Sequence, residues 1–248
     1  MKLSIITCTR NSMAFLPETI RSVHMQSRTD FEHIFVDGNS TDGTLEYLRK
    51  LPGNNLILEG VGGGIARAMN EGIRAASGDV IAHMHSDDYY LGTDVFSQVL
   101  DVFENTDKQW LFGRIMSDVD GVLRPETYTV PRYSYNQFLR GNFIPHPATF
   151  IRRKVFEECG VFSETLRYAM DYDFFLRIAR RYQPQQLDTH LAAFRRHDGS
   201  TTQANFMKSF AEDFEVRRMH AKWHQLPEAT LRYLVRRQRH LKRLAAHV

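Results

Sequence analysis

The chain has little cysteine and no long apolar run. Its 248 residues contain only Cys8 and Cys159, a usage that predicts free thiols in a reducing compartment and no disulfide framework. No apolar run approaches the roughly 20 residues that cross a bilayer, and the first residues enter a strand pattern without a basic leader. We therefore expect a cytoplasmic protein whose contact with a membrane is peripheral.

Two nucleotide-cofactor fingerprints are also missing. The glycines of residues 60–64 do not fit the pattern G-x-G-x-x-G, and no Gly-Lys-Ser/Thr follows them to make a P-loop. The segment does precede a predicted helix over residues 65–76, and a helix N-terminus favours an anion. Arg67 in the first turn of that helix is a candidate phosphate contact, with a solvent-facing arginine as the alternative.

Composition and charge indicate one catalytic domain with a basic tail. The 42% hydrophobic and 25% charged content is that of a globular protein. The formal net charge is +3, and much of the excess lies in the last helical stretch, so we divide the chain into a domain of residues 1–204 and a basic helical extension of residues 205–248. The extension fits either an anionic membrane surface or a packed helix with a solvated face. It lacks a nucleic-acid-reading motif and stacking aromatics, so we expect no nucleic-acid partner.

Strands and helices alternate along the first half of the chain. Apolar runs predict strands at residues 3–7, 31–36, 56–58 and 79–84, and amphipathic segments predict helices between them. This order is typical of an α/β fold with a doubly wound, mostly parallel sheet flanked by helices. Further strands are predicted at residues 110–115 and 148–151, with a hairpin at Asp120-Gly121.

Polar residues follow the strands of this predicted sheet. Thr9 and Arg10 leave the first strand, Asp37 follows the second, and Asp87 and Asp88 follow the fourth. The carboxyl ends of parallel strands face the ligand crevice, where adjacent carboxylates hold a divalent cation and a polar ligand. Asp37 is placed to hydrogen-bond a nucleotide base or ribose. Ordinary turns and helix caps remain the alternative for each of these acids.

The second half adds further candidates. Asp171 and Asp173 open an amphipathic helix, either as caps or with one of them acting as a general base. Because they lie two residues apart they cannot share a helix face, and Asp171 is better placed to project into a cleft. His146 lies between two prolines and either touches substrate or packs, while His197 completes a metal site, offsets phosphate charge or stays on the surface.

Taken together, several short motifs occur in one order. They are residues 36–44, 68–72, 78–79, 86–88 and 171–177. This series resembles family 2 glycosyltransferases with the GT-A fold over roughly residues 2–200, and within that family it is most similar to exopolysaccharide enzymes of the colanic acid type.

The resemblance implies inverting transfer from a UDP- or GDP-sugar to a lipid-linked oligosaccharide. By resemblance, Thr9 and Asp37 contact the nucleotide and Asp87 contacts the ribose or diphosphate region; Arg10 and Arg67 are further candidate donor contacts. Asp88 and His197 hold Mg²⁺ or Mn²⁺, and Asp171 is the base. Arg67 departs from the many relatives that carry an acid before Ala-Met-Asn. A sugar-nucleotide nucleotidyltransferase and a non-catalytic sugar-nucleotide or partner-binding module are the alternatives.

Overall fold

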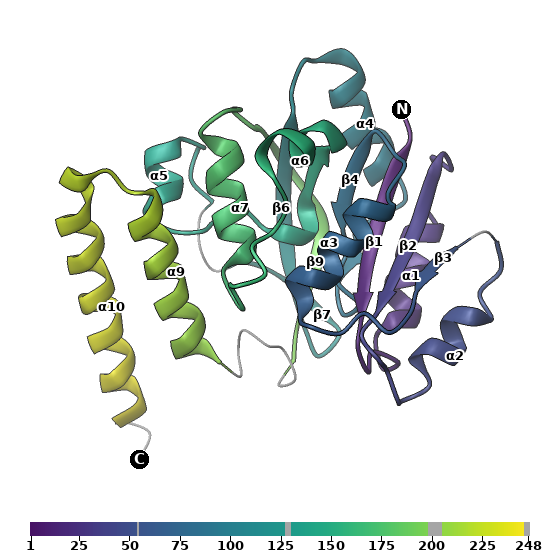
Figure 1. The fold of residues 1–248 in the computed structure, drawn as a ribbon, viewed down its shortest axis with the longest axis horizontal. Helices are drawn as coiled ribbons and strands as arrows, with labels where there is room; N and C mark the ends of the chain where they lie inside the picture. Colours follow the sequence, from purple (N-terminus) through teal and green to yellow (C-terminus); the bar gives the residue numbers. More distant parts are fainter. Residues whose placement is uncertain (54, 127–129, 198–204, 246–248) are drawn as a thin grey trace.

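The computed structural model describes residues 1–53, 55–126, 130–197 and 205–245 and shows an α/β fold built on one large sheet (Figure 1). Within these residues the sheet has nine strands; eight follow the order β3-β2-β1-β4-β8-β6-β9-β5, and β7 pairs with β6. The strands are β1 Leu3–Thr9, β2 Phe31–Asp37, β3 Leu56–Leu58, β4 Val80–His83, β5 Tyr89–Tyr90, β6 Trp110–Val119, β7 Val122–Pro125, β8 Thr149–Arg152 and β9 Gln185–Arg196.

Helices connect and cover these strands. They are α1 Leu16–His24, α2 Thr44–Arg49, α3 Ile65–Ala75, α4 Val95–Asn105, α5 Tyr135–Leu139, α6 Arg153–Cys159, α7 Met170–Ala179, α9 Phe206–His220 and α10 Leu226–Ala245, with short 3₁₀ turns η1 His146–Ala148 and η2 Trp223–Gln225. None of the described helices is both long enough and apolar enough to cross a membrane.

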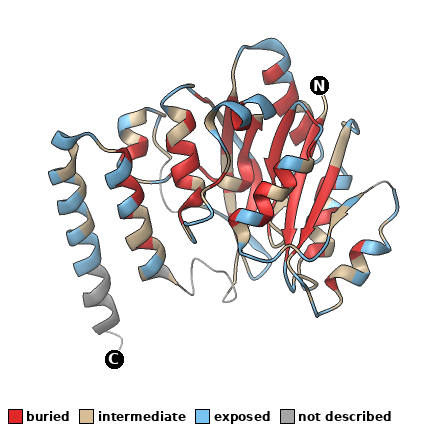
Figure 2. Ribbon diagram, viewed as in Figure 1, coloured by how far each residue is buried: buried red, intermediate tan, exposed pale blue. Residues whose placement is uncertain are grey.

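The first half of the sheet is parallel, and its strands β1, β2 and β4 are largely buried on both faces, whereas the edge strand β3 is only partly buried (Figure 2). Successive side chains of a strand point to opposite faces, so Leu3 and Ile5 enter the core that contains α4. Ile6 and Cys8 enter the core that contains α3, α6 and α7. The expected doubly wound sheet flanked by helices is confirmed, and both cysteines are free.

The second half of the sheet is mixed. Strand β8 lies antiparallel between β4 and β6, whereas β6 and β9 run parallel. The hairpin predicted at Asp120-Gly121 is confirmed, because Val119 pairs with Val122 and both turn residues have positive φ, 54° and 80°. Antiparallel β8 interrupts the parallel pattern without changing which edge carries the loops that follow β1, β2 and β4.

Helix α3 packs directly on β1. Gly72 lies at this contact, where a Cβ would overlap the Cγ2 atom of Ile6. Its lack of a side chain therefore lets the helix approach the sheet closely. The glycine of the 68–72 motif has a packing role.

The predicted C-terminal helices are α9 and α10. Helix α9 lies beside α7, and α10 lies outermost (Figure 1). Tyr233 of α10 stacks on Phe214 and Phe210 of α9, with ring centroids 4.3 and 5.0 Å apart. The contact between α9 and α7 places this part of the chain next to the helix that carries Asp171.

Candidate active site

Asp37 is the centre of a hydrogen-bonded group at the carboxyl edge of the sheet. Thr9 is its register partner on β1, and the Thr9 hydroxyl donates to the Asp37 carboxylate at 3.0 Å. The Ser40 amide and hydroxyl donate to the same carboxylate at 2.9 and 2.5 Å. Thr9 and Asp37 are both buried. Thr9 thus orients Asp37 from the neighbouring strand, which sequence spacing alone did not indicate.

The loop after β3 meets the same edge. The Val61 amide donates to the Asp37 carbonyl oxygen at 2.9 Å, which joins residues 60–64 to the end of β2. Arg10 and Arg67 are exposed here, Arg10 beside Gly38 and Arg67 over Gly63. Among the described residues no carboxylate forms an ion pair with either guanidinium. Both cations are available to an anionic ligand at this edge.

The two acids after β4 have different surroundings. Asp88 is 1% exposed, and one of its carboxylate oxygens accepts the Arg195 amide at 3.0 Å. Burial, together with the charge of Asp87, raises the pKa of Asp88 well above its ordinary value. The Thr19 hydroxyl donates to the Asp88 carbonyl at 2.7 Å and holds the turn. The other carboxylate oxygen of Asp88, Oδ2, is buried and has no hydrogen-bond partner among the described residues.

The Asp87 side chain instead faces His197, the residue that follows β9. Its Oδ2 atom lies 2.9 Å from Nε2 of His197, and the two side chains are 31% and 25% exposed. The Phe15 ring packs on the imidazole, with centroids 4.7 Å apart. The structure therefore pairs His197 with Asp87, where the sequence had grouped His197 with Asp88.

The Asp87–His197 pair has donors suitable for Mg²⁺ or Mn²⁺. A carboxylate oxygen and an imidazole nitrogen both ligate such ions, which often take their remaining ligands from substrate phosphates and water. No group of three or more His, Cys, Asp or Glu side chains among the described residues is arranged to hold a metal. A cation at this pair would therefore need oxygen ligands from a bound diphosphate.

Asp171 and Asp173 in the first turn of α7 are separated as expected for residues two apart on a helix. The Asp173 carboxylate binds His220 Nε2 at 2.9 Å and Arg177 Nε at 3.0 Å and is buried. Asp171 is half-buried, and its carboxylate accepts its neighbour's amide, that of Tyr172, at 2.6 Å. Within the described part of the chain Asp171 forms no ion pair.

The surroundings of Asp171 favour a protonatable carboxylate near neutral pH. Burial, reinforced by the charge of Asp213 on α9, raises the pKa of Asp171 to about 7. The Asn142 side chain hydrogen-bonds this carboxylate and acts in the opposite direction. Asn142 was not singled out from the sequence, where it was one polar residue in a proline-rich loop.

The segment between α6 and α7 is tied down at several points. Asn70 of α3 donates to the Phe162 carbonyl at 2.9 Å and accepts the Phe162 amide at 3.0 Å. Arg177 donates to the carbonyls of Cys159 and Val161, both at 2.6 Å. The asparagine of the 68–72 motif thus positions the approach to α7.

Three histidines, His83, His85 and His146, form a cluster at the end of β4. The rings of His83 and His146 are 5.3 Å apart, and those of His85 and His146 are 5.0 Å apart. Burial lowers the pKa of His83 to about 3, so this ring is neutral. His146 also packs on Phe162 and Phe175, at 5.6 and 5.5 Å. Of its two predicted roles, packing is the one that the structure displays.

Comparisons with known proteins identify the family of the chain. The model of the family described as glycosyl transferase family 2 matches residues 4–160. An uncharacterized glycosyltransferase of Mycobacterium tuberculosis is 32% identical over 200 residues, which cover 77% of this chain and 74% of that protein.

Solved structures share the fold at lower identity. Residues 1–349 of Staphylococcus aureus TarS, in complex with UDP-GlcNAc, align with a TM-score of 0.74 at 21% identity, over 95% of this chain and 73% of that one. The mannosyltransferase PcManGT from Pyrobaculum calidifontis, in complex with GDP-Man and Mn²⁺, aligns with a TM-score of 0.69 at 16% identity, over 93% and 69%. The fold is therefore of the GT-A type, and the chain belongs to glycosyl transferase family 2.

Proposed function

We propose that the protein is an inverting, metal-dependent hexosyltransferase that moves a sugar from a UDP- or GDP-sugar to an acceptor hydroxyl. One observation carries the proposal. Of the two acids that open α7, Asp173 is held by His220 and Arg177, whereas Asp171 keeps a carboxylate outside any ion pair of the described residues. Helix α7 begins at the lower edge of the sheet in Figure 1, where β1, β2, β4 and β9 also end.

The donor would lie along this edge. Asp37 and the backbone of its loop suit the hydroxyl and amide groups of a nucleoside, while Arg10 and Arg67 suit a diphosphate. Complexes of TarS with UDP-GlcNAc and of PcManGT with GDP-Man support a nucleotide-sugar donor in this fold.

The cation site that the geometry favours is the Asp87–His197 pair. Asp88 would act beneath it by fixing the backbone of β9 through the Arg195 amide. A bound Mg²⁺ or Mn²⁺ would offset the charge of the departing diphosphate. The Mn²⁺ in the PcManGT complex supports this choice of ion.

The reaction requires one proton transfer by the protein. The acceptor oxygen attacks the anomeric carbon from the face opposite the diphosphate, the carbon–oxygen bond to the diphosphate breaks, and the nucleoside diphosphate leaves. Asp171 accepts the proton of the attacking hydroxyl. A carboxylate with a pKa of about 7 suits this task at neutral pH, because a substantial fraction is ionised and the ionised form is basic enough.

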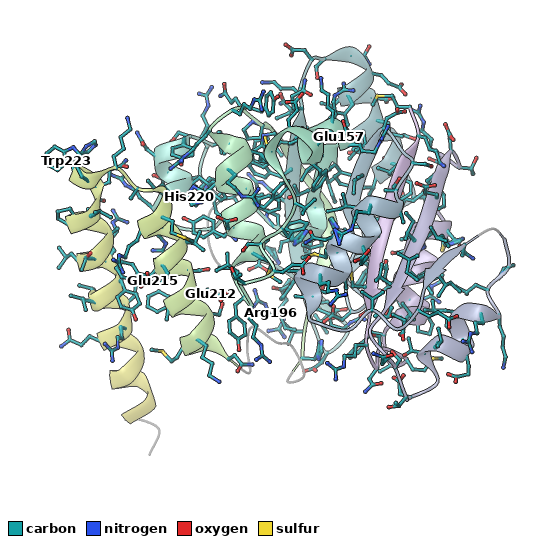
Figure 3. The ribbon with its side chains drawn as sticks, viewed as in Figure 1. Glu157, Arg196, Glu212, Glu215, His220 and Trp223 are labelled. Carbon is teal, nitrogen blue, oxygen red and sulfur yellow. The ribbon has the colours of Figure 1, made fainter. Side chains whose placement is uncertain are left out.

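We further propose that the acceptor is a lipid-linked oligosaccharide of a colanic acid-like exopolysaccharide, met at the cytoplasmic face of the membrane. Leu231 and Leu234 of α10 are 63% and 51% exposed, and Trp223 at the turn before it is 83% exposed (Figure 3). Exposed apolar side chains among arginines are typical of helices that lie on anionic lipid.

The substitution Asp171→Asn tests the assigned base. Turnover of UDP-GlcNAc or GDP-mannose with Mn²⁺, measured as released nucleoside diphosphate, is expected to fall roughly 10²- to 10⁴-fold, the usual worth of a general base. Titration calorimetry with UDP and GDP is expected to give unchanged affinity, because the nucleotide does not contact this residue.

Asp101→Asn is the matched control, since its side chain is 66% exposed on α4 and it should keep full turnover. Full turnover by Asp171→Asn would remove this residue from the mechanism. Release of pyrophosphate in place of nucleoside diphosphate would identify a nucleotidyltransferase.

A further inference from the structure

Helix α7 has no capping side chain at its N-cap position. Ala169 is the residue before its first turn and has no side-chain oxygen to accept a backbone hydrogen bond. The amides at a helix start need acceptors, and leaving buried amides unpaired is costly. Within the first turn the Asp171 carboxylate accepts the Tyr172 amide, whereas the amides of residues 167–169, just before the helix, take their acceptor from a distant part of the chain.

Glu212 of α9 supplies it. Its carboxylate accepts the Arg167 amide at 2.9 and 3.1 Å and the Ala169 amide at 2.7 Å, and it also accepts the Tyr168 amide. One side chain thus binds three consecutive backbone donors 43 to 45 residues earlier in the chain. A charged acceptor strengthens each of these hydrogen bonds.

Helix α9 is itself held against α7, so Glu212 is not a mobile ligand. His220, near the other end of α9, binds the Asp173 carboxylate at 2.9 Å. Its carbonyl oxygen accepts a guanidinium donor of Arg180 at 2.7 Å. Figure 3 shows Glu212 and His220 along the length of α9. Two points of attachment therefore set the position of the Glu212 carboxylate relative to α7.

Residues 160–169 are thereby clamped on both sides. Asn70 and Arg177 hold their beginning, and Glu212 holds their end, immediately before the turn that carries Asp171. Asp171 is only two residues beyond the last amide that Glu212 binds. A shift of the Ala169 backbone would be passed directly to the Asp171 carboxylate.

We propose that Glu212 is a positioning residue for the reaction, which holds the entry of α7 so that Asp171 meets the acceptor hydroxyl. The inference rests on the proposed function, because it acts through Asp171 as the base. It makes α9 part of the catalytic machinery, whereas the sequence had assigned this segment to a basic extension. Misplacing a reacting group by about 1 Å can cost about 10²-fold in rate.

The test compares Glu212→Gln, Asp171→Asn and the double variant. Glutamine keeps the shape but removes the negative charge and replaces one accepting oxygen by a donor, so its hydrogen bonds to the three amides are weaker. For release of nucleoside diphosphate from UDP-GlcNAc or GDP-mannose with Mn²⁺, Glu212→Gln is expected to lower kcat by roughly 10- to 100-fold and to leave KM within about twofold. The double variant is expected to match Asp171→Asn alone, because both changes disable one group.

Glu215→Gln is the matched control. Glu215 lies on the same helix and pairs only with Arg218 among the described residues, and its side chain is 57% exposed. It is expected to keep the wild-type kcat. Unchanged kcat in Glu212→Gln overturns the proposal, and so does a double variant whose loss equals the product of the two single losses.

Two outcomes separate this proposal from the proposed function. Full turnover by Asp171→Asn overturns the assigned base and every role that acts through it. A strong loss in Asp171→Asn with a multiplied loss in the double variant overturns only the Glu212 role. Amide hydrogen exchange in the wild-type protein adds a measurement that needs no variant: slow exchange at Tyr168 and Ala169 is expected, and rapid exchange at both contradicts the clamp.

Discussion

Asp171 and Asp173 carry the same carboxylate and behave in opposite ways because of their partners. Burial raises the pKa of Asp171 to about 7. Burial also acts to raise the pKa of Asp173, but the hydrogen bond from His220 and the charge of Arg177 outweigh it, so this pKa is lowered. Near neutral pH, Asp171 exchanges its proton while Asp173 stays ionised and structural. The surroundings of each carboxylate therefore determine its pKa and with it the role that the residue can take.

This difference predicts the pH dependence of the reaction. Below pH about 7, where Asp171 becomes protonated and unable to accept a proton, kcat/KM is expected to fall about tenfold per pH unit. Asp213 is the like charge that reinforces the effect of burial. Asp213→Asn should therefore lower the pKa of Asp171 and move the acid limb of the profile to lower pH. The measurement is donor turnover with Mn²⁺ between pH 5 and 9.

The same profile of Asp101→Asn serves as the control, because Asp101 lies on α4 and is exposed. An acid limb that stays in place in Asp213→Asn, or moves to higher pH, contradicts the role assigned to the neighbouring carboxylate. A profile with no acid limb near neutral pH contradicts the titration of Asp171 itself.

At the residue scale, the sequence predicts a side-chain arrangement when it depends only on neighbouring residues of one helix. Two acids two residues apart on a helix cannot share a face, and the structure shows Asp173 paired and Asp171 unpaired within its described residues. The orientation of Asp88 could not be predicted, because it depends on the amide of Arg195, 107 residues away on β9. The spacing of two adjacent acids indicates that their side chains point in different directions, but it does not indicate which side chain is buried in the protein.

At the scale of elements, α10 presents a surface that the core does not use. Tyr233 faces α9, whereas Leu231 and Leu234 are exposed, and Arg232 has half of its side-chain area exposed (50%). Arginines beside exposed leucines suit an anionic lipid surface, to which each cation contributes about 1 kcal/mol.

Replacing two of these cations tests the surface. Arg237, like Arg232, is exposed on α10. Arg232→Gln combined with Arg237→Gln is expected to weaken binding to phosphatidylglycerol vesicles roughly 30-fold, which corresponds to about 2 kcal/mol lost. Cosedimentation with vesicles measures the affinity, and vesicles of phosphatidylcholine alone should bind little of the wild-type protein.

The matched control is Arg49→Gln combined with Arg74→Gln. This pair removes the same charge, and Arg74 resembles Arg232 in exposure, at 51%, and in having a glutamate partner on its own helix. Equal loss of vesicle binding in both double variants would indicate that binding depends on the net charge of the protein and not on a specific surface of α10. Equal binding of all proteins would argue against membrane contact.

Most elements were predictable from local pattern, and their pairing was less so. A few neighbouring residues are enough to predict the β6–β7 hairpin, from its aspartate and glycine, and the strands β1 to β4, from their apolar runs. The antiparallel insertion of β8 between β4 and β6 has no comparable local signal. No spacing rule points from the amides of residues 167–169 to Glu212, which lies 43 to 45 residues later in the chain.

On the scale of the whole molecule, the proposed site is assembled from distant parts of the chain. The ends of β1 and β2 contribute Thr9 and Asp37, β4 and β9 bring Asp87 to His197, and α7 brings Asp171. Each part is held by its own contacts, so a donor that bridges them binds the folded state and not the unfolded chain. Ligand binding should therefore appear as global stabilisation.

This stabilisation is expected to depend on the metal. UDP or GDP at about 100 times its Kd with Mn²⁺ should add about 2.7 kcal/mol and raise Tm by roughly 5–10 °C. With a chelator the shift should shrink, because the diphosphate then has no cation to share with the Asp87–His197 pair. Asp87→Asn and His197→Ala should lose the Mn²⁺-dependent part of the shift, while Asp188→Asn, at a side chain 84% exposed, should keep it. Differential scanning calorimetry measures the Tm of the wild-type protein and the three variants with and without Mn²⁺.

A nucleotide-induced shift in Tm that is equal with Mn²⁺ and with chelator would show that the donor site does not use a cation. A Mn²⁺-dependent shift that survives in both site variants would place the cation away from the Asp87–His197 pair.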